Sequence, residues 1–176
     1  MVGIARIVSP GLLLLGLWVW GAQAAAAEQD AAFGRWAGPS SILELSSVDG
    51  QSLQGKVVAL KDPLFKAGDK GPEGQPVTDV NNPDPTRRGV PILGMDLFAN
   101  YQRKGKGWQG EIYDPESGKT YSSRLRVDKD GELLLRGYIG APMFGRTERF
   151  IPVSRCTNAI RKMLRLASLS GCSGDP

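Results

Sequence analysis

The stretch GWQGEIYDPESGKTYSSRLRVDKDGELLLRGYI, residues 107–139, decides the fold. It contains three segments in which apolar and polar residues alternate, a period that is typical of β-strands with one buried face. The connections between them consist mainly of Asp, Pro, Ser and Gly, which favour turns. The stretch therefore predicts a meander of three antiparallel strands. The three segments are residues 107–113, 119–127 and 132–139.

The middle segment predicts which side of the sheet is buried. Successive side chains of a strand point to opposite faces, so its residues divide into two sets. The set expected to face the core is Tyr121, Ser123, Leu125 and Val127, and the set expected to face solvent is Ser122, Arg124 and Arg126. One face of the predicted sheet is therefore solvated.

Further strands are predicted on both sides of the meander. Residues 41–47 and 52–60 flank the dipeptide Asp-Gly at 49–50, a strong hairpin signal, so these two segments should pair. Residues 146–153 supply a last strand, and Pro152 places the end of that strand at an edge or a terminus.

A long connection separates the first hairpin from the meander. Residues 61–91 are rich in proline and glycine and poor in apolar residues, which predicts a loop. Long loops in compact domains are often functional. Residues 92–101 regain an apolar pattern without a clear period, and we expect a short strand or a helical turn there.

Seven or so short antiparallel strands in a chain of this size must close or stack to cover their edges. We therefore expect an all-β fold, a small antiparallel barrel. The predicted organisation is a signal peptide at residues 1–24, a barrel domain at 28–155 and a helical tail at 156–176.

The N-terminus has the three parts of a secretory signal peptide. Arg6 supplies the positive charge, residues 11–20 (GLLLLGLWVW) form an apolar core shorter than a membrane span, and residues 22–24 (AQA) form a cleavage site. We expect cleavage after Ala24, with residues 25–27 as the alternative site. The processed protein is then expected to be periplasmic or secreted, and not an integral membrane protein.

Composition narrows the classes of function. The chain has 22 Lys and Arg against 18 Asp and Glu, and so small a surplus does not favour nucleic acid as a partner. The chain has no histidine, which excludes Ser-His-Asp and Cys-His catalysis, His-ligated zinc and proximal-His haem. We expect no cofactor, and we expect a protein that is not an enzyme.

Both cysteines, Cys156 and Cys172, lie in the C-terminal tail. Export takes them to an oxidising compartment, where a disulfide persists. We therefore expect a structural disulfide between them.

The same tail has a helical period after Thr157 or Asn158, either of which is a suitable N-cap. The apolar stripe is Ile160, Met163, Leu164 and Ala167, and the basic face is Arg161, Lys162 and Arg165. Such a helix either rests on an anionic membrane surface or docks on the barrel. We favour docking, because the stripe is narrow and short.

Several motifs occur in order between residues 33 and 153. They are Gly34-Arg35-Trp36, residues 55–63 (GKVVALKDP), 78–85 (TDVNNPDP), 92–94 (ILG), 107–121 (GWQGEIYDPESGKTY) and 127–138. Together they resemble the secreted bacterial family catalogued as domain of unknown function 2147. The resemblance implies an exported protein with a lipocalin-like barrel, and it implies no established activity. The first motif is also similar to the opening motif of lipocalins, in which the Trp plugs one end of the barrel.

A barrel with apolar and polar inward side chains suggests a site for a small ligand. The candidate ligand-binding residues are Trp36, Trp108, Tyr113, Tyr121, Arg136 and Tyr138. The alternative is that the polar members are structural, with Arg136 paired across strands to Glu148 on the outer face.

Residues 79–84 (DVNNPD) alternate carboxylate and amide oxygens, which suit calcium. The segment lacks the Gly and the Glu that an EF-hand loop has at fixed positions. Asp and Asn beside proline more often cap turns than bind a metal ion. We therefore predict a turn at Asp79, Asn81, Asn82 and Asp84, and no metal site. An enzyme that uses two carboxylates, such as a glycoside hydrolase, is another possible function, although the acidic residues lie mostly at predicted hairpin turns.

The leading hypothesis is an exported barrel that binds a small, partly apolar ligand, with the 61–91 loop near one mouth. The alternative is a non-enzymatic envelope protein that acts through protein or membrane-surface contacts of its basic C-terminal helix.

Overall fold

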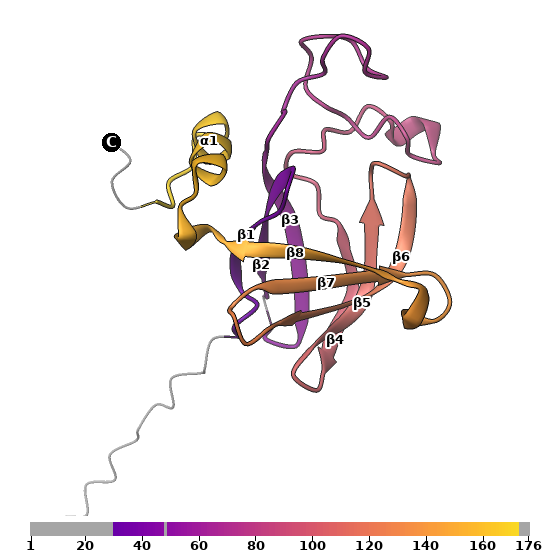
Figure 1. Cartoon of the computed structure of the whole chain (residues 1–176). Helices are drawn as coiled ribbons and strands as arrows, with labels where there is room; N and C mark the ends of the chain where they lie inside the picture. The colour runs from indigo at the N-terminus through magenta and orange to yellow at the C-terminus, as the bar shows by residue number, and fades with distance from the viewer. Residues whose placement is uncertain (1–29, 48, 173–176) are drawn as a thin grey trace, which may run out of the picture.

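A computed structural model describes residues 30–172 of the chain, apart from residue 48. Within that part, eight antiparallel strands close into a barrel, since each pairs with the next in sequence and β8 pairs with β1 (Figure 1). The strands are β1 (Gly34–Ala37), β2 (Ser41–Ser46), β3 (Ser52–Leu60), β4 (Phe98–Lys104), β5 (Gly107–Asp114), β6 (Lys119–Val127), β7 (Leu133–Tyr138) and β8 (Arg146–Pro152). The helical elements are three 3-10 turns, η1 (Pro85–Arg87), η2 (Pro142–Phe144) and η3 (Val153–Arg155), and the helix α1 (Asn158–Leu166).

The predicted fold class, a small antiparallel barrel with a short C-terminal helix, is confirmed. The predicted meander forms β5, β6 and β7, and the predicted first hairpin forms β2 and β3. On β6, Ser123 and Leu125 are buried while Ser122, Arg124 and Arg126 are exposed, as the alternation predicts. The predicted signal peptide lies outside the described residues.

The structure of segment 92–101 differs from the predicted short strand or helical turn. Its strand begins only at Phe98 and runs on to Lys104. Before it, the carboxylate of Asp96 accepts hydrogen bonds from the backbone N–H groups of Gly55 and Phe98, at 3.3 and 3.1 Å. Residues 94–97 nevertheless run antiparallel to β3, through backbone hydrogen bonds with Val57 and Gly55 and an isolated bridge between Lys56 and Asp96, before the strand begins at Phe98.

Aromatic rings fill the middle of the barrel. Phe98 and Tyr101 pack with their ring centroids 4.8 Å apart. Each ring lies against a glycine of a neighbouring strand, Gly55 and Gly110, at which a Cβ atom would clash with it. The buried core cluster comprises Ala32, Trp36, Leu43, Leu45, Leu53, Val57, Ile92, Phe98, Tyr101, Trp108, Leu125, Leu133, Leu135 and Phe150.

The N-terminal segment covers one end of the barrel. The carbonyl oxygen of Ala32 accepts a 2.8 Å hydrogen bond from the indole N–H of Trp36, and Asp30 forms an ion pair with Arg103. The guanidinium of Arg103 lies 5.3 Å from the ring centroid of Trp108. These contacts fix the segment against the ends of β4 and β5.

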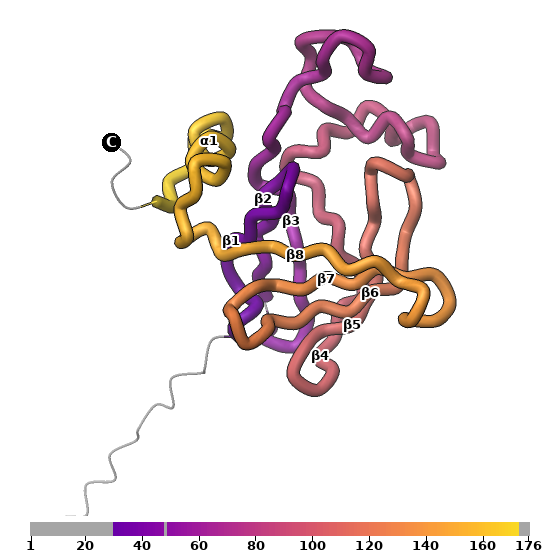
Figure 2. Tube along the Cα trace, viewed as in Figure 1, coloured from indigo at the N-terminus to yellow at the C-terminus, as the bar shows by residue number. Residues whose placement is uncertain are grey.

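The long connection between β3 and β4 lies at the opposite end and rises above the barrel in Figure 2. Ile92 belongs to the core cluster, and Val77 and Met95 pack against it. Asn81 donates to the carbonyl oxygens of Pro115 and Glu116 in the β5–β6 turn, each at 3.0 Å. The loop is thus bound both to the core and to the next hairpin.

Helix α1 docks on the outside of the barrel. Ile160, Met163 and Leu164 are buried in a second cluster with Ile42 and Ala59. Thr157 is the N-cap, and its hydroxyl accepts from the N–H of Ile160 at 3.3 Å. The packing of the helix therefore uses its apolar face.

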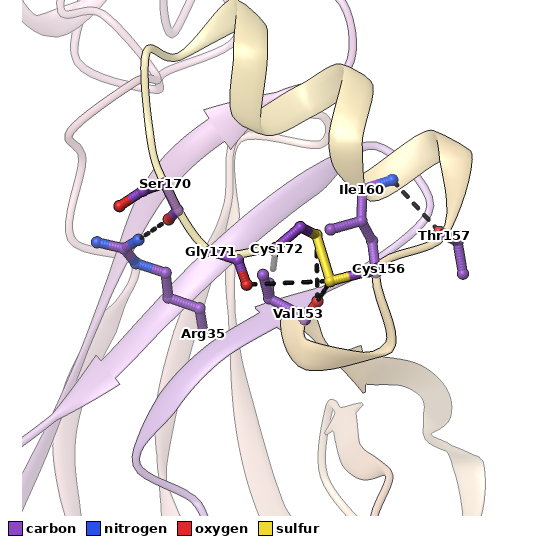
Figure 3. Close-up of a disulfide and its surroundings, with 8 residues drawn as sticks. All are labelled: Arg35, Val153, Cys156, Thr157, Ile160, Ser170, Gly171 and Cys172. Carbon is purple, nitrogen blue, oxygen red and sulfur yellow. Dashed lines mark hydrogen bonds between the residues drawn. A yellow bond between two sulfur atoms is a disulfide. The ribbon is translucent and has the colours of Figure 1, made fainter. Parts of the chain in front are cut away.

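The predicted disulfide between Cys156 and Cys172 is present and joins the two ends of the helical segment (Figure 3). Its Cα atoms are 5.5 Å apart. Of the helices in the described part of the chain, none has the length and apolar character needed to cross a membrane.

Candidate functional site

A groove of about 320 Å³ lies where β1 meets β8 and η3. We call it the β1–β8 groove. Its lining residues are Phe33, Arg35, Trp36, Pro152, Val153, Ser154 and Gly171. Trp36 is one of the residues predicted from the sequence to contact a ligand.

The groove exists because the barrel closes over a short seam. β1 has four residues, and its register with β8 covers only the pairs Trp36 with Pro152 and Ala37 with Ile151. Pro152 has no N–H group to continue the ladder, so the chain turns into η3 directly after it. The end of the seam is left as a depression between two backbones.

Arg35 supplies guanidinium N–H groups to one wall of the groove. Its Nε lies 2.9 Å from Oε1 of Glu44, and a terminal nitrogen donates to the carbonyl oxygen of Ser170 at 2.9 Å. Figure 3 shows this guanidinium reaching the chain segment just before Cys172. Two anchored contacts hold the guanidinium in place, and N–H groups remain for a further acceptor.

Behind the groove lies Trp108. Its ring centroid is 6.0 Å from that of Phe33, which lines the groove. Trp108 is 3% exposed, and its indole N–H has no hydrogen-bond acceptor among the described residues. Buried donors are normally paired, so this N–H is a site of unused hydrogen-bonding capacity.

The structure does not bring the six predicted ligand-binding residues into one site. Trp36 and Trp108 lie at the end of the barrel that the N-terminal segment covers. Tyr113 and Tyr121 lie beside the β5–β6 turn, where their hydroxyls contact Asp79 at 2.9 Å and Ser117 at 3.2 Å. The two hydroxyl groups therefore attach a loop residue and a turn residue to the strands.

Arg136 and Tyr138 lie in the C-terminal half of β7, where Tyr138 is opposite Ser122 on β6. Arg136 is opposite Arg124 on β6 and Thr147 on β8, while Glu148 is opposite Leu135. The interpretation of Arg136 as the cross-strand partner of Glu148 is therefore wrong, because the register is offset by one residue. Arg136 instead binds the connection that follows its own strand.

The 79–84 segment forms side-chain capped turns. Asp79 is 1% exposed and accepts from the amide of Asn82 at 2.6 Å, and Asp84 caps η1 through the N–H and hydroxyl of Thr86. Among the residues that the structure describes, no group of three His, Cys, Asp or Glu side chains is placed to hold a metal ion. The carboxylate oxygens of this segment accept hydrogen bonds from loop residues and, for Asp79, also from Tyr113 on β5.

Two features were missed by the sequence reasoning. Tyr101 and Ser123 form a hydrogen-bonded pair in the core, and burial raises the pKa of the Tyr101 phenol. Arg35 and Val153 line the β1–β8 groove. The period of β1 and β8 predicts which face these residues occupy, but only the barrel closure brings the two strands together.

A second depression, of about 430 Å³, lies over the exposed side of α1. Its lining among the described residues is Asn158, Arg161, Lys162, Arg165 and Leu166. All five belong to one helix, so we base no site on it.

An eight-stranded antiparallel barrel with an aromatic core is a lipocalin-like fold. The model of the family described as "Uncharacterized protein conserved in bacteria (DUF2147)" matches residues 34–151, and the chain belongs to this family. The predicted resemblance is therefore confirmed. No curated protein matches the chain.

A solved structure with a similar fold is that of protein HP1028 from the human pathogen Helicobacter pylori, which is described as belonging to the lipocalin family. The two sequences are 18% identical, and the TM-score is 0.56. The similarity covers 78% of this chain and 89% of the other. At this identity the likeness shows the fold alone.

Proposed function

We propose that this protein is exported to the periplasm or the medium and binds a small, partly apolar ligand in the β1–β8 groove. The observation that carries the proposal is the chemistry of that groove. Phe33, Pro152 and Val153 give it apolar walls, while Arg35 and Ser154 supply polar groups. Small-ligand sites combine a mostly apolar surface with a few polar groups that fix orientation, and they start at about 300 Å³.

The polar groups favour a ligand with an oxygen-rich end. The N–H groups of Arg35 that are not used by Glu44 and Ser170 are suited to a carboxylate or carbonyl oxygen. The unpaired N–H of Trp108, behind Phe33, offers a second donor if the Phe33 ring moves aside. An aliphatic or aromatic carboxylic acid has the right chemistry.

Export is supported by the N-terminal pattern of charge, apolar core and small residues. The disulfide supports it independently, because such a bond favours a non-cytoplasmic environment.

The alternative function, a non-enzymatic envelope protein acting through protein or membrane-surface contacts of α1, would have to use the basic face of that helix. A helix that lies in a membrane interface buries its apolar face in the lipid. In α1 that face is already packed on the barrel, with Ile160, Met163 and Leu164 each 3% exposed or less.

The test is native mass spectrometry of the protein purified from the exported fraction of cells that make the full chain. We expect a mass that lacks residues 1–24, carries one disulfide, and shows an additional co-purified small molecule. The variant Ser154→Trp, which fills the groove from an exposed position, should lose the additional mass. The control Ser122→Trp adds the same side chain at an exposed position on β6 and should keep it. Wild-type protein without a bound mass, or a mass retained by Ser154→Trp, would contradict the proposal.

A further inference from the structure

The connection between β7 and β8 exposes an unusual amount of apolar surface. Ile139, Met143 and Phe144 are 67%, 77% and 81% exposed, the highest values for large hydrophobic side chains in the described part of the chain. All three lie within residues 139–145, which we call the β7–β8 tip. In Figures 1 and 2 it projects at the right of the barrel, on the opposite side from α1. Apolar patches of this kind on a soluble protein mark interaction sites.

The tip has a fixed conformation, and Arg136 is the reason. Its Nε donates to the carbonyl oxygen of Pro142 at 2.8 Å, and its terminal nitrogens donate to the carbonyl oxygen of Met143 at 3.3 Å and the hydroxyl of Thr147 at 2.8 Å. The backbone N–H of Phe144 donates to Ala141 at 3.1 Å, within η2. The apolar side chains are therefore held outward by a defined turn.

The tip is flanked by positive charge. Arg124 stands directly opposite Arg136 in the sheet, an arrangement that costs stability unless something else favours it. Arg146 begins β8 immediately after the tip, but its register opposite Gly137 places it on the other face of the sheet from Arg124 and Arg136. No described acidic side chain lies within ion-pair distance of these three arginines, and the partners of Arg136 are all neutral.

Acidic groups nearby do not cancel this charge. Glu111, opposite Ser122, shares the outer face with Arg124, but its carboxylate accepts from the amide of Asn100 at 3.4 Å. Glu148, opposite Leu135, shares its face with Arg146 and not with Arg124 or Arg136. Arg149, further down the outer face, is different because it pairs with Asp128 and Glu132. The outer face of the sheet thus carries two arginines without an acidic partner among the described residues, Arg124 and Arg136, beside the tip.

We propose that the β7–β8 tip is a membrane-docking surface for anionic phospholipid. Met143, Phe144 and Ile139 insert into the boundary between headgroups and acyl chains, while Arg124 and Arg136 meet the lipid phosphates. The proposal does not depend on the β1–β8 groove, which lies at the other end of β8. It adds a location for the protein, namely the surface of a membrane.

Two observations favour lipid over a protein partner. The tip projects from the barrel, whereas a docked peptide or helix usually needs a groove. Its charge complements anionic headgroups, and apolar side chains beside arginines are the combination by which peripheral proteins bind such membranes.

The test is co-sedimentation with vesicles of phosphatidylcholine and phosphatidylglycerol, using the chain from residue 25 onward, which keeps every described residue. We expect binding that weakens with added salt. The double variant Met143→Ser/Phe144→Ser should bind about tenfold or more weakly, because two apolar side chains no longer leave water. Arg124→Gln should weaken binding to these vesicles and leave any residual binding to pure phosphatidylcholine unchanged.

The matched control is Val90→Ser/Leu93→Ser, which removes two exposed apolar side chains from the long loop. It should bind as the wild type does. The proposal is overturned if the wild type fails to sediment with phosphatidylglycerol vesicles, or if both double variants bind equally. It is also overturned if the wild type ignores vesicles but forms dimers in sedimentation equilibrium that only Met143→Ser/Phe144→Ser abolishes, since the tip would then be a protein contact.

Discussion

The phenol of Tyr113 donates a 2.9 Å hydrogen bond to the buried carboxylate of Asp79. The bond joins β5 to the long loop between β3 and β4. The other carboxylate oxygen accepts from Asn82 at 2.6 Å, and no described cation is within ion-pair distance of Asp79. A buried charge without a cation depends on its hydrogen bonds, so this pair fixes the loop to the barrel.

Tyr113→Phe should therefore destabilise the protein. Removing one donor leaves a buried carboxylate oxygen unsatisfied, and we expect the free energy of unfolding to fall by about 1–3 kcal/mol in urea. Tyr121→Phe is the control, because among the described residues its hydroxyl bonds only to the exposed Ser117, at 3.2 Å, and its loss should cost about 0.5 kcal/mol or less. Equal losses in the two variants would show that Asp79 does not depend on Tyr113.

The same pair predicts a loss of stability at alkaline pH. Burial, the hydrogen bond to Asp79 and the charge of Asp79 raise the pKa of Tyr113 to about 12 from its ordinary value of 10. Above pH 10 the unfolded chain releases this proton while the folded protein keeps it, so the contribution of Tyr113 is complete below about pH 10 and falls as the pH rises toward 12.

Urea unfolding at a series of pH values from neutral to alkaline checks this dependence. The difference in stability between wild type and Tyr113→Phe should be constant up to about pH 10 and should shrink above it. Tyr101, whose pKa burial also raises, is present in both proteins and cancels in the comparison. A difference that stays constant throughout the alkaline range would contradict the assignment.

The sequence predicted the barrel because its signals are local. Alternation and Asp-Gly or Asp-Pro turns specify β2, β3 and the β5–β7 meander without reference to the rest of the chain. The irregular pairing of residues 94–97 with β3 was not predictable in this way, since it joins segments that are distant in sequence, such as Asp96 and Gly55.

The candidate site was less predictable than the fold. Residue types suggested Tyr113, Tyr121 and Arg136 as ligand contacts, but loop residues already occupy their polar groups. The β1–β8 groove arises from the short register of the seam, which no local pattern specifies. The β7–β8 tip did leave a signal, namely apolar Met143 and Phe144 in a turn after Pro142.

Gly118 provides a test of how tightly the long loop is attached. Its φ of 67° is unfavourable for other residues, and a Cβ atom there would clash with the carbonyl oxygen of Asn81. Gly118→Ala should therefore lower the free energy of unfolding by about 2 kcal/mol or more. Gly131→Ala is the control: its φ is 71° but nothing lies within 4 Å of the added atom, so only about 1 kcal/mol should be lost. Equal effects of the two changes would mean that the loop moves away from the β5–β6 turn at little cost.

The disulfide should stabilise the C-terminal helix against the barrel. Cys156 and Cys172 are separated by 16 positions, and closing a loop of that length contributes about 3 kcal/mol in the chain-entropy model. The double variant Cys156→Ser/Cys172→Ser should lose stability of this order in urea. It should also let the amides of α1 exchange with solvent much faster, while those of β5 and β6 keep their order of protection. Thr157→Ala removes the N-cap and leaves the disulfide, so it should cost only about 1 kcal/mol. If the double variant matched Thr157→Ala in both measurements, the apolar contacts of Ile160 and Leu164 would hold the helix by themselves, and the disulfide would contribute little to the fold.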